Sequence, residues 1–338
     1  MRFLLFLLLC SGMPFTIQAK QKSPDNPETL IAFGSCAHEY ETVPAFNTIA
    51  DIKAEIFVWL GDMIYADTRD MAVMKKKYDE MKKKAEYQNL LNSMPVIGVW
   101  DDHDFGINDG GKHYIQKDES KLLALDFLDV AEDDPRNFYD GLYTSYNLAT
   151  NEKLVKIILL DTRYFRDTLY TDNDKRNLYL LNETGDILGE EQWAWLEKEL
   201  STQGVDLFII GSSIQLIAKD HYYEKWANFP ASRARLLGLL KIANPTPVLV
   251  ISGDRHIAEV SQMDVEGLDY PLIDFTSSGL THTWKEYFPE PNSYRMGDLI
   301  VQKNFGLISI EWDDAGPKIS FKVKGINGED YLEYSYKY

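Results

Sequence analysis

Four short apolar segments, each ending at residue types that bind metals, constrain the fold of this chain most strongly. Residues 29–33, 56–60, 96–100 and 248–252 are rich in strand-forming side chains, and each run stops abruptly at a polar loop. Such runs are typical of buried parallel strands, which are apolar on both faces. In open α/β sheets, ligands bind at the carboxyl ends of the strands, because the loops there converge on one crevice. We therefore expect the four loops to form one site.

The four loops carry Cys, Asp and His residues that point to a bound cation. They read Gly34-Ser35-Cys36, Gly61-Asp62-Met63-Ile64-Tyr65, Asp101-Asp102-His103-Asp104 and Gly253-Asp254-Arg255-His256. One Gly-Asp pair after a strand is more often a simple turn, but four such endings together favour a metal site. Residues 101–104 contain three carboxylates and one imidazole. The carboxylates would repel one another unless cations or solvent compensated their charge.

Each loop offers a particular chemistry. Asp62 is the candidate bridging ligand, because one carboxylate can hold two cations about 3.5 to 4 Å apart. Tyr65 could supply a phenolate suited to a ferric ion, or it could be a packing residue with a hydrogen-bonded hydroxyl. Asp102 is the expected ligand of its loop, and His103 is placed to stabilise or protonate a leaving oxygen. In the fourth loop, Asp254 and His256 occupy alternate positions and can both face the site.

The cysteine count makes Cys36 informative. The chain has two cysteines, and Cys10 lies in the apolar N-terminal segment. If that segment is removed, Cys36 is left as a single thiol in an oxidising compartment, where it needs protection. Burial as a small hydrophobic residue and ligation of a metal as a thiolate are the two explanations.

The N-terminus has the order of a secretory signal. Arg2 is followed by an apolar run over residues 3–9 and then by Thr16-Ile17-Gln18-Ala19. We expect cleavage after Ala19 and export to the periplasm or the extracellular space. A lipoprotein anchor on Cys10 is disfavoured because the large Leu9 precedes it. No other stretch approaches the roughly 20 apolar residues that span a bilayer.

The net charge limits the classes of binding partner that are expected. With 35 Lys and Arg against 53 Asp and Glu, the formal net charge is −18. Nucleic-acid binding through phosphate contacts requires clustered cations and is therefore not expected. A small substrate is expected instead, and the sequence does not indicate an oligomeric state.

The remaining pattern indicates an α/β sandwich with a mixed sheet, built as one domain over residues 28–338. Helices are expected at residues 45–54, 70–92, 120–130, 189–200 and 232–243, and further buried strands at 156–160, 207–210 and 272–275. Near the C-terminus the pattern changes, because residues 307–312, 319–323 and 331–336 alternate apolar with polar side chains. Alternation of this kind is typical of antiparallel strands with one wet face, and it predicts a C-terminal meander.

The four loops, in this order, resemble the alkaline phosphatase D (PhoD-like) family of metallophosphatases. The resemblance extends to Leu160-Asp161-Thr162-Arg163 and to residues 188–193, and it covers about residues 31–282. It implies a four-layer αββα fold, with two central sheets flanked by helices, and a binuclear centre of Fe³⁺ and Ca²⁺. By position, Cys36, Asp62 and Tyr65 match the iron side, Asp102, Asn108 and Asp254 match the second metal, and His256 belongs to the same shell.

The resemblance implies hydrolysis of phosphate monoesters or diesters by in-line attack of a metal-bound hydroxide. His103 would assist the leaving group, and Arg163, Arg255, His38 and His282 are candidates for anchoring phosphoryl oxygens or for structural ion pairs and packing. A phospholipase-D-like diesterase is one alternative. A secreted glycan-binding protein that has lost catalysis is another, and it would require a broken ligand set. Unlike many bacterial members, this sequence shows no twin-arginine signal, since Arg2 is the only basic residue before Lys20.

Overall fold

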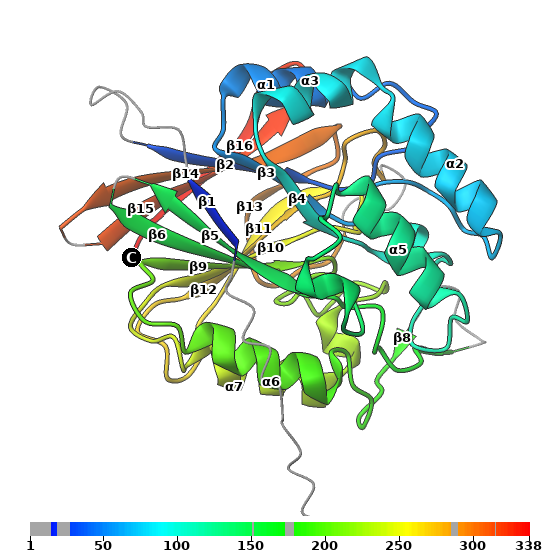
Figure 1. Ribbon diagram of the computed structural model, residues 1–338. Helices are drawn as coiled ribbons and strands as arrows, with labels where there is room; N and C mark the ends of the chain where they lie inside the picture. The colour runs from blue at the N-terminus through cyan, green and yellow to red at the C-terminus, as the bar shows by residue number, and fades with distance from the viewer. Residues whose placement is uncertain (1–14, 19–27, 151, 173–178, 285–289, 315) are drawn as a thin grey trace, which may run out of the picture.

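The computed structural model describes residues 15–18, 28–150, 152–172, 179–284, 290–314 and 316–338. Within these residues two β-sheets pack face to face, and helices cover the outer face of each sheet (Figure 1). In Figure 1, α1 and α3 lie above the first sheet, and α6 and α7 lie below the second. The four layers are those that the family resemblance implies, and the mixed α/β fold class is confirmed.

The first sheet contains three of the predicted site strands. Its strand order is β16-β15-β14-β2-β3-β4. The parallel strands are β2 (Thr29–Gly34), β3 (Ile56–Leu60) and β4 (Val96–Val99), and the antiparallel meander is β14 (Asn304–Asp313), β15 (Gly316–Gly325) and β16 (Asp330–Lys337). Helix α1 (Ala45–Ile52) makes the crossover from β2 to β3. The predicted strands and the C-terminal meander are therefore confirmed.

The second sheet has the order β1-β5-β6-β9-β10-β12-β11-β13. Its members are β1 (Phe15–Gln18), β5 (Thr144–Thr150), β6 (Lys153–Leu159), β9 (Leu207–Ser212), β10 (Val248–Ser252), β11 (Ala258–Met263), β12 (Leu272–Ser277) and β13 (Arg295–Ile300). The parallel run β6-β9-β10-β12 contains every strand that the sequence predicted for this half. Strand β1 lies inside the predicted leader and pairs with β5, whereas the rest of that leader lies outside the described residues.

The helices differ from the sequence prediction in two places. The predicted loop at residues 101–104 contains the short helix α4 (Asp102–Phe105). The single helix expected over residues 70–92 is two helices, α2 (Met71–Lys82) and α3 (Ala85–Ser93), separated by an extended Lys84. The break has a packing reason, because α3 packs against α1 while α2 packs against α5 (Lys117–Phe127). Helices α6 (Gly189–Leu200) and α7 (Pro230–Leu240) lie close to their expected positions. None of the helices in the described ranges is long and apolar enough to cross a membrane.

Aromatic contacts join the two sheets and so hold their carboxyl edges together. Phe33 on β2 meets Phe275 on β12 edge to face, with ring centroids 4.9 Å apart, and Phe275 meets Phe321 on β15 in the same way at 5.7 Å. All three side chains are fully buried. Each such pair stabilises the fold by about 0.5 to 1.5 kcal/mol beyond the area that it buries. The loops of both sheets can therefore build one site.

Candidate metal centre

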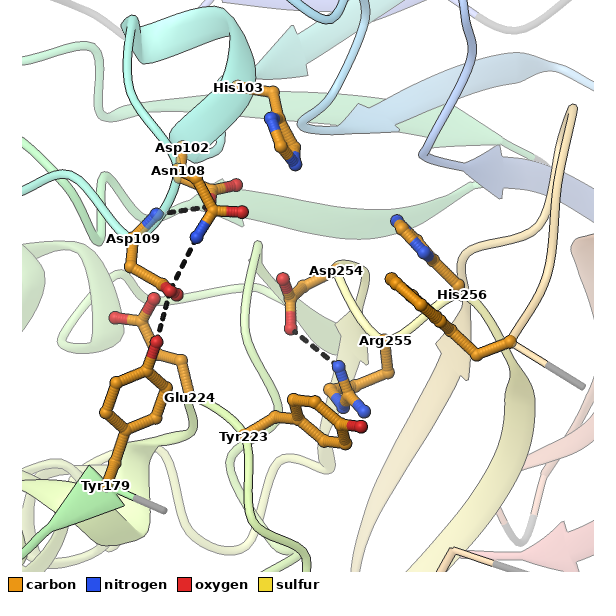
Figure 2. Close-up of a pocket in the computed structure, with 11 residues that line it drawn as sticks. Asp102, His103, Asn108, Asp109, Tyr179, Tyr223, Glu224, Asp254, Arg255 and His256 are labelled. Atoms are coloured by element: carbon orange, nitrogen blue, oxygen red, sulfur yellow. Dashed lines mark hydrogen bonds and ion pairs between the residues drawn. The ribbon is translucent and has the colours of Figure 1, made fainter. Parts of the chain in front are cut away.

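Four of the seven predicted ligands line one cavity at the carboxyl edges of the two sheets, whereas Cys36, Asp62 and Tyr65 are not in its lining (Figure 2). The cavity has a volume of about 190 Å³. Its lining residues are Asp102, His103, Asn108, Asp109, Tyr179, Tyr223, Glu224, Asp254, Arg255, His256 and Trp284. Asp102, Asn108, Asp254 and His256 were predicted as ligands, so the sequence identified much of this lining.

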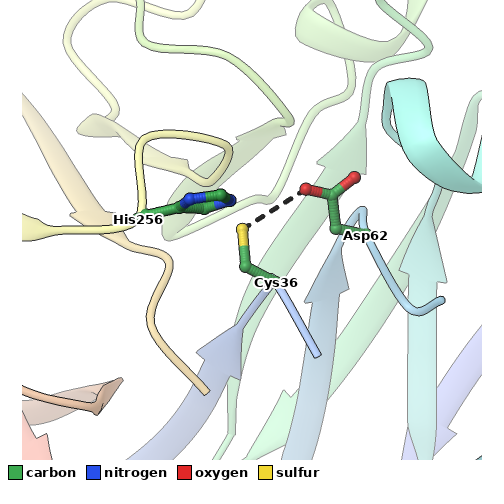
Figure 3. Close-up of side chains that lie close together, drawn as sticks. All are labelled: Cys36, Asp62 and His256. Carbon is green, nitrogen blue, oxygen red and sulfur yellow. Dashed lines mark hydrogen bonds between the residues drawn. The ribbon is translucent and has the colours of Figure 1, made fainter. Parts of the chain in front are cut away.

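Potential ligand atoms form three overlapping groups. The groups are Cys36 with Asp62 and His256, Asp62 with Asp102 and His103, and Asp101 with Asp102 and Asp254, and within each group the atoms lie within 4.8 Å of one another. Asp62 and Asp102 each belong to two groups. In Figure 3 the Cys36 thiol points at the Asp62 carboxylate, with Sγ 3.4 Å from Oδ2. The arrangement offers adjoining positions for cations that share bridging carboxylates.

The predicted ligands occupy strained turns. Cys36, Asp62, Asp254 and His256 have φ angles of 64°, 50°, 65° and 54°. Residues other than glycine rarely adopt this left-handed region, and holding one there costs of order 1 to 3 kcal/mol. Each strand ends in a sharp turn at the residue that faces the site, and the surrounding contacts must stabilise that turn.

Two glycines allow these turns to pack closely. Gly61 has a φ of 87°, and a Cβ atom at this position would lie 2.2 Å from the Cβ of Asp101. A Cβ on Gly253 would lie 2.6 Å from the carbonyl oxygen of Leu60. The glycines before Asp62 and Asp254 are therefore required by close contact between neighbouring strand ends.

Tyr65 sits at the centre of the thiol side. Its hydroxyl donates to Asp62 Oδ2 at 3.2 Å and lies 2.9 Å from His256 Nε2 and 3.1 Å from His282 Nε2. Burial raises the pKa of Tyr65 well above its usual value, and burial lowers the pKa of His282 to about 3. In these surroundings the Tyr65 hydroxyl keeps its proton. Tyr65 would become a phenolate only if a bound cation took the place of that proton.

The backbone of Tyr65 is held from both sides. Its N–H donates to Glu39 Oε2 at 3.1 Å, and Lys77 Nζ donates to its carbonyl oxygen at 2.6 Å. Lys77 also donates to Glu39 Oε1 at 2.6 Å, which closes the arrangement. This pair could not be predicted from the sequence, because Lys77 belongs to a lysine run that indicates only a solvated helix face.

Buried carboxylate oxygens that accept no hydrogen bond support cation binding, although Arg163 lies 3.9 Å from Asp102 Oδ1 and Arg255 lies 3.6 Å from Asp254 Oδ2. Asp62 Oδ1, Asp102 Oδ1 and Asp254 Oδ2 are buried and have no hydrogen-bond partner among the described residues. Burial raises the pKa of Asp62 and of Asp254 well above the usual value. Burial acts in the same direction on Asp102, but the charges of His103 and Arg163 outweigh it and hold the pKa of Asp102 at about 2. Buried oxygens without donors are costly unless a metal satisfies them, so the donor set fits cations.

His103 is oriented by a carboxylate that the sequence did not single out. Its Nδ1 lies 2.7 Å from Asp67 Oδ2, and Asp67 Oδ1 accepts from the N–H of Asn108 at 3.0 Å. Burial lowers the pKa of His103, but the charges of Asp102, Asp62 and Asp67 outweigh it and raise the pKa to about 11. His103 can therefore hold a proton beside the cavity.

The far wall of the cavity consists of residues that the sequence missed. Asp109 Oδ2 accepts from Tyr179 Oη and, at 2.6 Å, from Asn108 Nδ2, and the N–H of Asp109 donates to Asp102 Oδ2 at 2.6 Å. Burial raises the pKa of Asp109 to about 7. Glu224 lies on the same wall. Tyr179 lies in the short strand β8 (Tyr179–Leu180), whereas Asp109 and Glu224 lie in irregular loops. The only sequence signal for this wall was the Asn-Asp-Gly turn at residues 108–111.

Arg163 does not line the cavity. It is fully buried, its Nε donates to Asp101 Oδ1 at 2.5 Å, and its Nη1 donates to Glu224 Oε2 at 2.5 Å. The nearby motif residues position this arginine. Gln192 exchanges two 2.9 Å hydrogen bonds with the backbone of Asp161, and Asp161 Oδ1 accepts from the N–H of Arg163 at 2.8 Å. Of the roles expected for Arg163, the geometry favours the structural ion pair.

The other predicted anchors are distributed around the site. Arg255 lines the cavity, but Glu290 accepts from its Nε at 3.1 Å and from its Nη2 at 2.7 Å, and its guanidinium packs 3.9 Å from the ring centroid of Tyr223. His38 and His282 are not in the lining. They stack on each other with centroids 4.6 Å apart, on the Tyr65 side.

Comparison with known proteins supports the same relationship. The family model for "PhoD-like phosphatase" matches residues 136–295. The chain is 24% identical over 281 residues to alkaline phosphatase D of Bacillus subtilis (strain 168), covering 71% of this chain, and it spans about half (48%) of that relative's length.

Two solved structures share the fold. The structure of PhoD matches with a TM-score of 0.70 at 17% identity, over 95% of this chain and 72% of that one. The structure of a dimetal phosphatase from Danio rerio matches with a TM-score of 0.52 at 14% identity, over 92% of this chain and 100% of that one. These two matches show the fold, and the family model and the curated relative support a relationship of this chain to the PhoD-like phosphatases.

Proposed function

We propose that this protein hydrolyses phosphate esters at a binuclear metal centre. The observation that carries the proposal is the set of three overlapping ligand groups, joined through Asp62 and Asp102 and containing buried carboxylate oxygens without hydrogen-bond partners. The relationship to PhoD-like phosphatases supports the reaction class. We further propose that residues 28–338 act as one catalytic domain, because the largest apolar core includes residues from both sheets.

The donor chemistry differs between the two sides of the centre. Cys36, Tyr65 and His256, with Asp62, would hold one cation, and thiolate with phenolate suits Fe³⁺. Asp102, Asn108 and Asp254, again with Asp62, would hold the other, and an oxygen-only set suits Ca²⁺. When bound, the cations would withdraw charge from the phosphoryl oxygens and acidify a water molecule.

The protein's own residues would then place and protonate the substrate. His103 is held by Asp67 through Nδ1, so its Nε2 is available to donate a proton to the leaving oxygen. Arg255 is fixed by Glu290 at the cavity wall and would orient a phosphoryl oxygen. Arg163 would act as a positioning residue, because it holds Asp101 beside Asp102.

The catalytic interpretation is preferred over an inactive glycan-binding protein because the sequence contains every ligand that the resemblance implies. In addition, the carboxylate, thiol and imidazole ligands lie close together in the structure.

The test is metal analysis with a visible spectrum of the wild type and of Cys36→Ser and Tyr65→Phe, with aryl phosphate monoesters and diesters assayed alongside. We expect bound iron, a charge-transfer band that changes in both variants, and a loss of hydrolysis. The exposed Tyr222 supplies the control, since Tyr222→Phe should change neither readout. A wild type that binds no metal after reconstitution with iron and calcium and cleaves neither ester would refute the proposal.

We also propose export, on the basis of the apolar run over residues 3–9. The described part of the predicted leader includes β1, which pairs with β5. N-terminal sequencing of secreted protein should begin at Lys20. Secreted protein that retains residues 15–18 would contradict cleavage after Ala19.

A further inference from the structure

The segment that carries Tyr65 is not held by regular secondary structure. Strand β3 ends at Leu60, and the backbone then turns through the left-handed region at Asp62. The N–H and the carbonyl oxygen of Tyr65 take part in no strand ladder, and side chains from elsewhere pair with both groups. Glu39 Oε2 accepts from the N–H at 3.1 Å, and Lys77 Nζ donates to the carbonyl oxygen at 2.6 Å. We call these two side chains the Glu39–Lys77 clamp.

The clamp is closed and largely buried. Lys77 Nζ also donates to Glu39 Oε1 at 2.6 Å, so each member binds both Tyr65 and the other member. The side chain of Glu39 is 3% exposed and that of Lys77 is 25% exposed. Loss of one partner would leave a buried charge without compensation, which costs far more than loss of an exposed ion pair. The clamp also joins separate parts of the chain, because Glu39 follows the Cys36 loop and Lys77 lies on α2.

Lys77 differs in geometry from the two lysines before it. Lys75 Nζ donates to Asp79 Oδ1 at 2.9 Å, and Lys76 Nζ lies 3.6 Å from Glu80 Oε1, so both pair along the surface of α2. Their side chains are 52% and 76% exposed. Successive residues of a helix point about 100° apart, and of these three lysines it is Lys77 that reaches the site loops. The lysine run therefore supplies its own control residues.

The clamp determines where the phenol of Tyr65 lies. The Tyr65 ring lies between the rings of His38 and His103, with centroids 4.0 Å and 4.2 Å away. Its hydroxyl is 3.2 Å from Asp62 Oδ2 and 2.9 Å from His256 Nε2. Contacts with ring faces limit the tilt of the phenol but allow it to slide between them. The backbone anchor therefore determines how far the hydroxyl reaches toward Asp62.

From this geometry we propose that Lys77 and Glu39 are positioning residues of the metal centre, which hold Tyr65 so that its oxygen meets the cation on the thiol side. The proposal rests on the proposed function, and it gives a residue of a surface helix a role there. Neither side chain lines the catalytic cavity, so both act through Tyr65. A misplacement of about 1 Å can lower a rate by about 10²-fold, and loss of a residue that orients a ligand lowers metal affinity or activity by about 10- to 100-fold.

The first measurement needs neither metal nor substrate. The label 3-fluorotyrosine is placed at position 65 alone, and its fluorine NMR resonance is recorded in the metal-free wild type, in Lys77→Met and in Lys76→Met. Methionine keeps the apolar stem of lysine without its charge. We expect one narrow resonance in the wild type and in Lys76→Met. The resonance should be shifted or broadened in Lys77→Met, because a phenol without its anchor samples more than one position.

Glu39→Gln is the second variant, and it keeps the test open if Lys77→Met does not fold. Its amide offers one acceptor oxygen to the two donors that Glu39 binds, the Tyr65 N–H and Lys77 Nζ. One of the two bonds is therefore lost, and the resonance of Tyr65 should again shift or broaden.

The second measurement compares iron affinity, the visible spectrum of the iron-loaded protein and hydrolysis of p-nitrophenyl esters. Lys77→Met should weaken iron binding by about 10- to 100-fold and lower kcat by a similar factor, with KM little changed. Its charge-transfer band should also shift in wavelength, whereas a general loss of stability would lower only the intensity of that band. Lys76→Met should match the wild type in every readout.

The outcomes separate the clamp from the proposed function. If the fluorine resonance responds to Lys77→Met and not to Lys76→Met, but the wild type hydrolyses no ester, the proposed function fails and the clamp on Tyr65 stands. Identical resonances in Lys77→Met and Lys76→Met would overturn the clamp even if hydrolysis were normal. A resonance that is already broad in the wild type, or a Lys77→Met protein with the wild-type kcat and band position, would overturn it as well.

Discussion

Gly61→Ala tests whether close packing of strand ends builds the site. The new methyl group would lie 2.2 Å from Asp101 Cβ and 2.5 Å from Asp101 N, and the residue would have to keep a φ of 87°. Asp101 cannot move aside easily, because its side chain accepts from Arg163 and its N–H donates to Asp104 Oδ1 at 2.6 Å. The left-handed backbone costs about 1 to 3 kcal/mol, and overpacking costs about 1 to 3 kcal/mol more, so we expect a loss of roughly 2 to 6 kcal/mol in the free energy of unfolding.

Two other glycines separate these contributions. Gly204 has a φ of 76° with no atom within 4 Å of an added Cβ, so Gly204→Ala should cost only the backbone contribution of about 1 to 3 kcal/mol. Gly238 lies within α7 with equally open space, so Gly238→Ala should stabilise the protein by about 0.5 to 1 kcal/mol.

Urea titrations measure the free energy of unfolding of the three variants and of the wild type. Equal m-values would show that the four proteins expose the same surface on unfolding. Metal content, measured in parallel, should fall only in Gly61→Ala, because Asp62 and Asp101 shift together there. If Gly61→Ala were as stable as Gly204→Ala and held the same metal, the packing explanation of the Gly-Asp motif would be refuted.

Three further outcomes follow from the same geometry. Arg163→Leu should cost about 3 to 5 kcal/mol in unfolding free energy, because it leaves the buried carboxylates of Asp101 and Glu224 unpaired. Arg235→Leu, at an exposed ion pair, should cost about 1 kcal/mol or less. Urea titration of both variants measures the difference. Burial raises the pKa of Asp104 from 3.8 to about 8, so the metal-free protein should lose stability as pH rises through this range; a urea midpoint that increased between about pH 5 and about pH 8 would contradict this. His103→Ala should slow hydrolysis of alkyl-leaving-group esters by about 10² to 10⁴-fold and affect p-nitrophenyl esters less, and equal losses for both in steady-state assays would exclude proton donation by His103.

The ends of the buried strands could be predicted well because a buried strand has a simple sequence pattern. A strand buried on both faces is a continuous apolar run, and its end is marked where a Gly, Cys or Asp interrupts that run, as at Cys36, Asp62 and Asp254. The same reasoning found the meander near the C-terminus. It did not find β5, β11 or β13, whose mixed composition gives no such run.

The rest of the site could not be predicted because only tertiary packing brings its residues together. Asp109, Tyr179 and Glu224 stand in no recognisable sequence motif, and only the packing of three distant segments brings them to one wall. The break between α2 and α3 is equally invisible, since residues 82–84 are all lysines and contain no Gly or Pro. Burial likewise could not be predicted for Arg163, because arginine is usually exposed and becomes buried here only through Asp101 and Glu224.

The strained turns and the buried carboxylate oxygens have one common consequence. Cys36, Asp62, Asp254 and His256 hold left-handed backbones, and among the described residues Asp62 Oδ1 and Asp254 Oδ2 have no hydrogen-bond partner, so these features destabilise the metal-free fold. Cations that supply the missing partners would recover this free energy, which makes metal binding part of the protein's stability. On the proposed function, a site built in this way would bind its cations tightly, because the fold is already arranged around them. The net charge of −18 acts in the same direction, because each bound cation also reduces the repulsion within an acidic chain.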